Sequence, residues 1–283
     1  GPIRMPSRDE AEEAGEKLRA GWKAKNLAEL RSMPADRLVV PRVPGGPSTG
    51  PSVDGYVLPS PIGHIFAARQ QSDVPLMLGF TKDESLGGIG AVSTIEEFRA
   101  KATALFGNAA SRFFELYPGS TDAEARTQAR LADRDATMVT GMFGWASRQR
   151  SFGNAPVYAY EFSRPHSYAA RVTFSDLDPA TAGAYHTAEV PFWLGNLDAF
   201  NRFRKTRAWT ASDYAMSKTL VQTLLTFART GRPETPGIDW PEFSPDQSRL
   251  VEIGNALEVH SWPEREKLEF FRSIYGAAGN DGE

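Results

Sequence analysis

Cysteine is absent from this 283-residue sequence, which excludes disulfide bonds, thiolate nucleophiles and cysteine-ligated zinc. Blocks of consecutive basic residues are also absent and the formal net charge is −3, so the positive field that attracts nucleic acid or anionic lipid is missing. The longest apolar runs, such as residues 74–80, are far shorter than the roughly 20 residues needed to cross a bilayer. We therefore expect neither a nucleic-acid partner nor a membrane partner. The absence of cysteine is compatible with the cytosol and with an oxidising compartment, so the sequence does not assign a localisation.

The overall composition is that of a globular protein able to bury a substantial core. Hydrophobic residues make up 41% of the chain and charged residues 24%. The first five residues show no charged region followed by an apolar stretch, so we expect no signal peptide there. One large domain is the simplest organisation for this length.

Hydrophobic periodicity and capping signals predict alternating helices and strands along most of the chain. The helices are expected over residues 9–20, 27–33, 93–106, 110–117, 123–151, 212–230 and 263–275, the last one capped by Ser261. The strands are expected over residues 74–80, 157–162, 249–253 and 257–260, the last two forming a hairpin. Strands separated by helices indicate an α/β fold with a mostly parallel sheet that is flanked by helices and carries a helical insertion.

Two residues fit the acid and base roles of a serine triad, which needs a near-neutral base and a buried carboxylate that orients it. Glu84 follows the expected strand 74–80, at the sheet edge where α/β proteins place their sites. His186 lies about a hundred residues later, in an expected loop. Spacing alone leaves open the alternative that Glu84 is an ordinary solvated loop charge.

The sequence around these two residues resembles the type B carboxylesterase and cholinesterase family of α/β-hydrolases. Residues 79–85 (GFTKDES) are similar to the family pattern G-x-N-x-D-E-G, and residues 185–196 (YHTAEVPFWLGN) to H-x-x-E-x-x-F-x-F-G-N. The resemblance implies that Glu84 is the catalytic acid and His186 the catalytic base. Thr81 and Ser85 depart from the pattern, where the family has Asn and Gly. Further short matches keep their order between about residues 52 and 262.

Three neighbours of His186 are candidate supporting residues. Glu189 stands where the family often keeps a glutamate, so it either orients the loop by hydrogen bonding or is an exposed charge. Phe192 and Trp193 follow closely and either wall a substrate pocket or belong to the core. The sequence does not separate these alternatives.

A metal or other cofactor is not expected. The remaining histidines, His64, His166 and His260, lack the two-residue or four-residue spacing of metal ligands, and no motif gives them a role. Ester hydrolysis through an acyl-enzyme also needs no cofactor.

The serine nucleophile is the part of the triad that the sequence does not supply convincingly. The single G-x-S-x-G string is residues 46–50, centred on Ser48, but prolines 44, 47 and 51 surround it and no helix follows. A nucleophile elbow must enter from a strand and lead into a helix, so Ser48 is not expected to act. No His-Gly-Gly-Gly segment for an oxyanion hole occurs either.

We therefore expect residues 1–283 to be the C-terminal portion of one carboxylesterase-type α/β-hydrolase domain. Its partners would be a small-molecule ester and the N-terminal half of the same protein, which would bring the nucleophile elbow and the oxyanion hole. The expected function is hydrolysis of a carboxylic ester by a Ser-Glu-His triad, with this portion inactive by itself. The alternatives are a catalytically inactive, cholinesterase-like binding or adhesion module, and a free-standing domain that works with Ser48.

Overall fold

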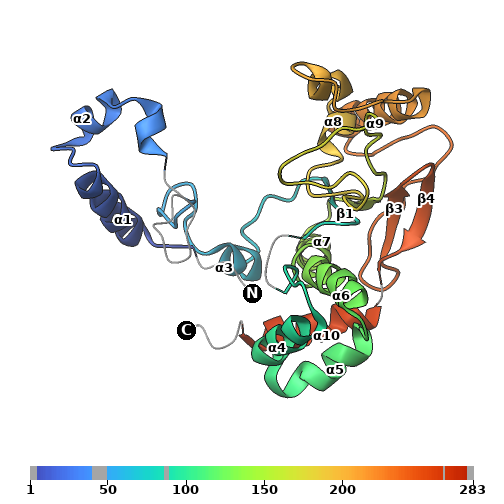
Figure 1. Cartoon of the computed structure of the whole chain (residues 1–283), viewed down its shortest axis with the longest axis horizontal. Helices are drawn as coiled ribbons and strands as arrows, with labels where there is room; N and C mark the ends of the chain where they lie inside the picture. Colours follow the sequence, from blue (N-terminus) through green and yellow to red (C-terminus); the bar gives the residue numbers. More distant parts are fainter. Residues whose placement is uncertain (1–4, 40–49, 86–88, 264, 279–283) are drawn as a thin grey trace. The chain divides into compact units, whose positions relative to one another are not determined.

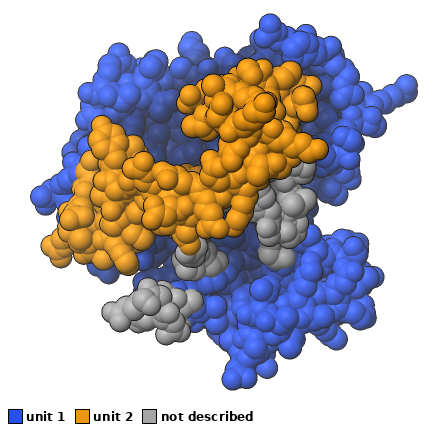
Figure 2. Space-filling view, turned by 90° about the vertical axis from the view of Figure 1, so that its left-hand side faces the viewer, with its two compact units in different colours: residues 1, 73–283 blue, residues 2–72 orange. Residues whose placement is uncertain are grey.

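The computed structural model describes residues 5–39, 50–85, 89–263 and 265–278. The chain divides into two compact units, one of residues 2–72 and one of residues 73–283 (Figure 2). The region of residues 41–51 that was expected to be a loop, Ser48 included, lies almost wholly outside the described residues. No helix in the described ranges is both long and apolar enough to span a membrane.

The unit of residues 2–72 consists of short helices and loops with almost no core. Its helices are α1 (Arg8–Gly21), α2 (Leu27–Ser32), the 3₁₀ helix η1 (Ala35–Leu38) and α3 (Ile62–Ala67). Ser7 and Glu10 form a capping box at the start of α1, each side chain accepting a hydrogen bond from the other residue's backbone N–H. Ala24 is the one described residue of this unit that is buried. Side-chain caps, by Ser7 and Asn26, therefore define the starts of α1 and α2, with little apolar packing.

The unit of residues 73–283 is built on a four-stranded sheet with the order β1-β2-β3-β4 (Figure 1). The strands are β1 (Leu76–Thr81), β2 (Val157–Phe162), β3 (Arg249–Ile253) and β4 (Leu257–Ser261). The first three are parallel, and β4 returns antiparallel to β3. The expected α/β class with a mostly parallel sheet is confirmed. Because β1 and β2 are parallel, their carboxyl ends lie at the same end of the sheet.

Side chains of β2 alternate between the two faces of this sheet, and each face has its own helical cover. Val157 and Ala159 pack with residues of α7 (Thr140–Phe152) and α10 (Arg265–Ala278). Tyr158 and Phe162 pack on the other face with residues of α8 (Val190–Trp193) and α9 (Ala211–Thr230). The 3₁₀ helix η4 (Leu197–Asn201) connects α8 and α9.

A helical insertion follows β1 and forms a third apolar cluster. It consists of α4 (Ile95–Phe106), the 3₁₀ helix η2 (Gly107–Ala109), α5 (Ala110–Leu116) and α6 (Asp122–Arg134). Phe98 and Phe113 are fully buried in it and pack with Phe271 of α10. The insertion thus shares α10 with the sheet, and the two form one folded unit.

The expected single helix over residues 123–151 is wrong in one respect. A π-helical segment, η3 (Asp135–Val139), separates α6 from α7. The Asp135 carboxylate accepts hydrogen bonds from Tyr117 and Arg134, and the Asp135 carbonyl accepts one from the Thr140 hydroxyl at 2.6 Å. These side-chain bonds hold the widened turn, and such segments are frequent at functional sites.

The expected start of the last helix is also wrong. Ser261 is the final residue of β4 and pairs with Arg249 of β3, so it does not cap a helix. The α10 helix begins at Arg265. The hairpin is one residue longer than expected because backbone pairing to β3 continues through Ser261.

Candidate active site

Glu84 and His186 meet at the carboxyl end of β1, where a carboxylate oxygen of Glu84 is hydrogen-bonded to Nδ1 of His186. They are 102 residues apart in the sequence. Since an ionised carboxylate only accepts, Nδ1 carries the proton and Nε2 is left as the basic nitrogen. Among the described residues no hydrogen-bond partner is recorded for Nε2, and the His186 side chain is 53% exposed.

The carboxylate of Glu84 is held by Thr81, the last residue of the strand that precedes it. Glu84 is 2% exposed, and its Oε2 accepts hydrogen bonds from the Thr81 backbone N–H at 3.0 Å and the Thr81 hydroxyl at 3.2 Å. A buried carboxylate needs such donors to remain in place. Thr81, noted as a departure from the family pattern, therefore supplies two donors to the acid.

Asp83 ties the loop that carries His186 to the end of β1. Its N–H donates to the Ala184 carbonyl at 3.0 Å, and its carboxylate accepts from the Ala184 N–H at 2.7 Å. Gly183 precedes this contact with φ of +55°, and Thr187 follows His186 with φ of +72°. The histidine thus sits in a tight turn that is bonded directly to the acid loop.

Arg134 holds the same loop from the helical insertion. Its guanidinium donates to the Lys82 carbonyl at 3.0 Å and pairs with Asp135 at 2.6 Å and with Glu161 at 3.6 Å. Burial raises the pKa of Glu161, while the charges of Arg134 and Lys82 act to lower it. The insertion therefore contributes a buried, charged support beneath Lys82, Asp83 and Glu84.

Glu189 is not the fully exposed charge that one of its two expected alternatives describes. Its side chain is half-buried, and Oε2 is buried with no hydrogen-bond partner among the described residues. Burial raises the pKa of Glu189, the charge of Glu84 raises it further, and the charge of His186 acts in the opposite direction. Its backbone carbonyl accepts from the N–H groups of Phe192 and Trp193 at the start of α8. The carboxylate accepts a hydrogen bond from the backbone N–H of Glu189 itself, which acts to lower its pKa, and a role in orienting the loop stays a prediction.

Phe192 and Trp193 lie in the apolar cluster on this face of the sheet. Phe192 is fully buried and packs on Phe162 with 5.3 Å between ring centroids. Trp193 packs on Tyr160 with 5.2 Å between ring centroids. A role in substrate binding stays a prediction for both residues.

The other three histidines do not belong to the string that carries His186, and each has a different environment. His64 is in α3 of the other unit, and His260 contacts Glu252 and Glu258 on the exposed hairpin. His166 is buried, with hydrogen bonds that the sequence gave no reason to expect. In the described ranges no group of three or more His, Cys, Asp or Glu residues is arranged to hold a metal.

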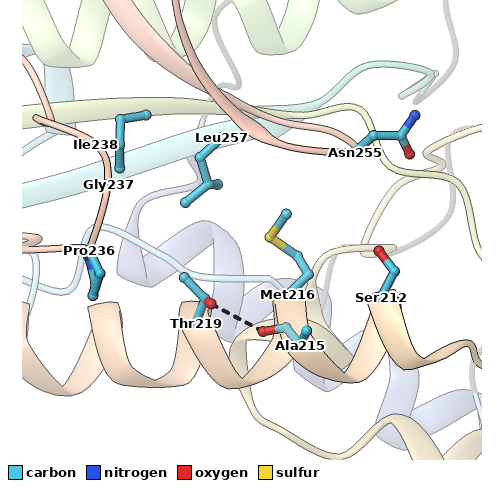
Figure 3. Close-up of a pocket in the computed structure, with 9 residues that line it drawn as sticks. All are labelled: Ser212, Ala215, Met216, Thr219, Pro236, Gly237, Ile238, Asn255 and Leu257. Carbon is cyan, nitrogen blue, oxygen red and sulfur yellow. Dashed lines mark hydrogen bonds between the residues drawn. The ribbon is translucent and has the colours of Figure 1, made fainter.

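A separate pocket of about 320 Å³ lies between α9 and the β3–β4 hairpin (Figure 3). Its lining residues are Ser212, Ala215, Met216, Thr219, Pro236, Gly237, Ile238, Asn255 and Leu257. Neither Glu84 nor His186 lines it. The pocket therefore belongs to the flank of the sheet and not to the acid–base pair.

The parallel sheet, its two helical layers and the pair at a strand end define the α/β-hydrolase class. A solved structure titled "PNB ESTERASE" has the same fold, with a TM-score of 0.63 and 22% identity over 95% of this chain and 55% of that chain. A model of the carboxylesterase family matches residues 8–271, and the chain belongs to this family.

Curated relatives support the same family membership. Para-nitrobenzyl esterase of Bacillus subtilis is 27% identical over 229 residues, which are 77% of this chain and 42% of that protein. Acylcarnitine hydrolase of Rattus norvegicus is 29% identical over 217 residues, 70% of this chain and 36% of that protein. Fumonisin B1 esterase of Sphingopyxis macrogoltabida is 26% identical over 200 residues, which are 69% of this chain and 35% of that protein. The chain therefore spans well under half the length of these relatives.

Proposed function

We propose that this chain supplies the acid and base of a Ser-Glu-His triad that hydrolyses a small carboxylic ester. The observation that carries the proposal is the hydrogen bond from His186 Nδ1 to the buried Glu84, which leaves Nε2 basic and accessible. The names of the relatives, among them an esterase and an acylcarnitine hydrolase, support ester hydrolysis as the reaction class. Membership of the carboxylesterase family supports the same class.

The chemistry follows from the two nitrogen positions of His186. Its Nε2 removes the proton of a serine hydroxyl as the serine oxygen attacks the ester carbonyl, and Glu84 stabilises the imidazolium that forms. The imidazolium then gives this proton to the departing alcohol oxygen, which leaves an acyl-enzyme. Water then attacks the acyl carbonyl while the same nitrogen takes its proton, and the imidazolium returns a proton to the serine oxygen as the carboxylic acid leaves.

We further propose that the serine and the oxyanion hole come from a segment outside these 283 residues. The G-x-S-x-G string around Ser48 is flanked by prolines, and the relatives carry more than twice the length matched by this chain. A nucleophile elbow needs a strand and a helix on its two sides. This proposal makes the chain alone inactive.

The coding sequence upstream of Gly1 provides the first test. A G-x-S-x-G elbow there supports the esterase proposal, and its absence would favour the inactive binding or adhesion module. Expressed together with that segment, the chain is expected to hydrolyse short-chain aryl esters. Ser→Ala at the elbow is expected to abolish turnover, whereas Ser48→Ala leaves it unchanged.

A fluorophosphonate probe provides the second test, because it labels serines that a neighbouring base activates. The chain alone is expected to remain unlabelled and to show no aryl-ester turnover. Labelling at Ser48, or turnover by the chain alone that Ser48→Ala removes, would overturn the assignment of the nucleophile.

A further inference from the structure

His166 lies on the segment that leaves β2, and it bonds to both sides of His186 in the sequence. It is 4% exposed, and its Nε2 is 2.8 Å from the carbonyl oxygen of Ala188. Its Nδ1 is 3.1 Å from the hydroxyl of Tyr185. The residue before His186 and the residue two positions after it therefore contact one imidazole ring.

Arg207 fixes which nitrogen of His166 carries the proton. Its Nε donates to Nδ1 of His166 at 3.0 Å, and a terminal nitrogen donates to the Tyr185 hydroxyl at 3.3 Å. Since a guanidinium has no acceptor, Nδ1 must accept and the proton must be on Nε2. In that tautomer Nε2–H donates to the Ala188 carbonyl, which needs a donor.

The guanidinium of Arg207 is itself held by aromatic rings. It belongs to a side chain that is only 3% exposed. The rings around it are those of Tyr168, Phe174 and Phe200, with centroids 4.3, 5.2 and 4.9 Å from the guanidinium carbon. Arg207 is therefore a buried donor aimed at His166 and Tyr185.

We propose that His166 is a positioning residue for His186, acting through its bonds to Tyr185 and Ala188 on either side of it. The turn between them needs such anchoring, because Thr187 adopts a φ of +72° that a β-branched residue rarely takes. The expected effect on turnover rests on the proposed esterase function, whereas the effect on the His186 ring does not.

Burial keeps the His166 ring neutral. Burial lowers the pKa of His166 to about 4, the bond to Ala188 acts to raise it, the charge of Arg207 lowers it and the charge of Asp213 raises it. The other groups packed on the ring are Tyr168, Tyr185, Phe192, Phe200 and Trp209. The neutral tautomer that serves Ala188 and Arg207 is therefore the form present near neutral pH.

Two amide substitutions separate the two bonds of His166. In His166→Gln the side-chain amide reaches the Nε2 position and keeps a donor for Ala188. In His166→Asn the amide oxygen reaches the Nδ1 position and keeps an acceptor for Arg207, but the donor for Ala188 is lost. Tyr185→Phe removes only one hydroxyl and serves as a mild variant if either amide fails to fold. His260→Gln is the matched control, because His260 is exposed on the hairpin.

The first readout is the NMR chemical shifts of the His186 ring protons in the full chain, compared at one pH, which needs no substrate. His166→Asn is expected to move these resonances clearly, because the turn that carries the ring loses one of its anchors. His166→Gln and Tyr185→Phe are expected to move them less, and His260→Gln not at all. Unchanged His186 resonances in His166→Asn, or in Tyr185→Phe if the former does not fold, would overturn the proposal.

The second readout is ester turnover with the serine-bearing segment present. His166→Asn is expected to lower kcat about tenfold or more with KM nearly unchanged, because misplacing a catalytic group affects the reacting geometry. If the unsubstituted protein shows no turnover, the proposed function fails. The NMR comparison of the His186 ring then still tests whether His166 positions His186. A purely structural role would lower the melting temperature while both readouts stay at the unsubstituted values.

Discussion

Glu84 is buried, and both oxygens of its carboxylate are hydrogen-bonded, Oε2 to Thr81 and Oε1 to His186. We expect Glu84→Gln to lower kcat on the order of 10⁴-fold, because a neutral amide no longer holds the right tautomer or stabilises the imidazolium. The measurement is aryl-ester turnover with the serine-bearing segment present. Glu258→Gln is the control, since Glu258 is a hairpin carboxylate that contacts His260 only at the surface. Equal activity of both variants would contradict the assignment of Glu84.

The buried His166 makes stability depend on pH in a defined window. Its pKa of about 4 in the folded state is below the ordinary value of 6.5, so the unfolded chain binds more protons between these values. The free energy of unfolding is therefore expected to fall by about 3 kcal/mol as the pH drops from 6.5 to 4. Urea unfolding at several pH values measures this. In His166→Gln this part of the fall should disappear, and its persistence would contradict the assignment.

The half-buried Glu189 acts in the opposite direction. Burial and the charge of Glu84 raise its pKa in the folded state, so folding favours the protonated form. Stability contributed by this group is therefore lost as pH rises from its unfolded pKa through the raised folded one. Glu189→Gln is expected to remove that loss, visible as a smaller decrease of melting temperature over this range. A steeper decrease in Glu189→Gln would contradict the expectation.

Sequence motifs singled out Glu84 and His186, but they missed the residues that hold these two side chains. Glu84 and His186 each sit in a recognisable string, and the structure brings them together. Arg207 and His166 are 41 residues apart, and no local pattern indicates that a guanidinium will donate to this imidazole. The role of Asp83 depends on tertiary pairing with Ala184 and is likewise invisible in a linear motif.

The turn that carries His186 depends on a glycine at a crowded position. Gly183 has φ of +55°, and a Cβ there would meet the Asp83 carboxylate at 2.1 Å. Gly237 also has positive φ, at +84°, but a Cβ there meets nothing within 4 Å. We expect Gly183→Ala to lower the free energy of unfolding by roughly 2–3 kcal/mol and Gly237→Ala by about 1 kcal/mol. Thermal unfolding compares them, and equal losses would contradict the role of the Asp83 contact.

Elements with strong local signals were predicted closely, whereas interruptions were not. The β2 strand has the predicted bounds because its aromatic and β-branched residues form a short run after Pro156. The π segment η3 was missed because residues 123–151 keep helical periodicity, and the widened turn depends on Tyr117 from another helix. The four-residue helix α8 was missed because it is too short to show a period.

The two units differ in how much core they contain, and this predicts different opening rates. The unit of residues 2–72 has only Ala24 buried among its described residues, while the other contains three apolar clusters. We expect amides of α1 to exchange with solvent much faster than those of β2, because few apolar contacts resist local unfolding. Hydrogen-exchange mass spectrometry measures this, with α9 as a helical control. Equal protection of α1 and α9 would contradict the expectation.

The alternation of strands and helices in the sequence predicted the fold class, but it did not predict that the chain divides into two compact units. Periodicity predicts elements one at a time, whereas the division of the chain depends on which elements bury one another. Two of the helices of residues 2–72, α1 and α2, begin with side-chain caps, yet none of the helices of this unit buries a residue. The expectation that the chain is part of a single larger domain stays a prediction.

The order of the sheet places β1 and β4 at its two edges, and the two strands are very different there. The β4 strand carries the polar side chains of Glu258 and His260, and the carboxylate of Glu258 discourages another strand from pairing. The β1 strand, residues 76–81, is apolar apart from its final threonine, and no strand pairs with its second edge among the described residues. We therefore expect purified chains to aggregate by strand addition along β1. A lysine introduced on β1 is the first substitution to try for a longer shelf life.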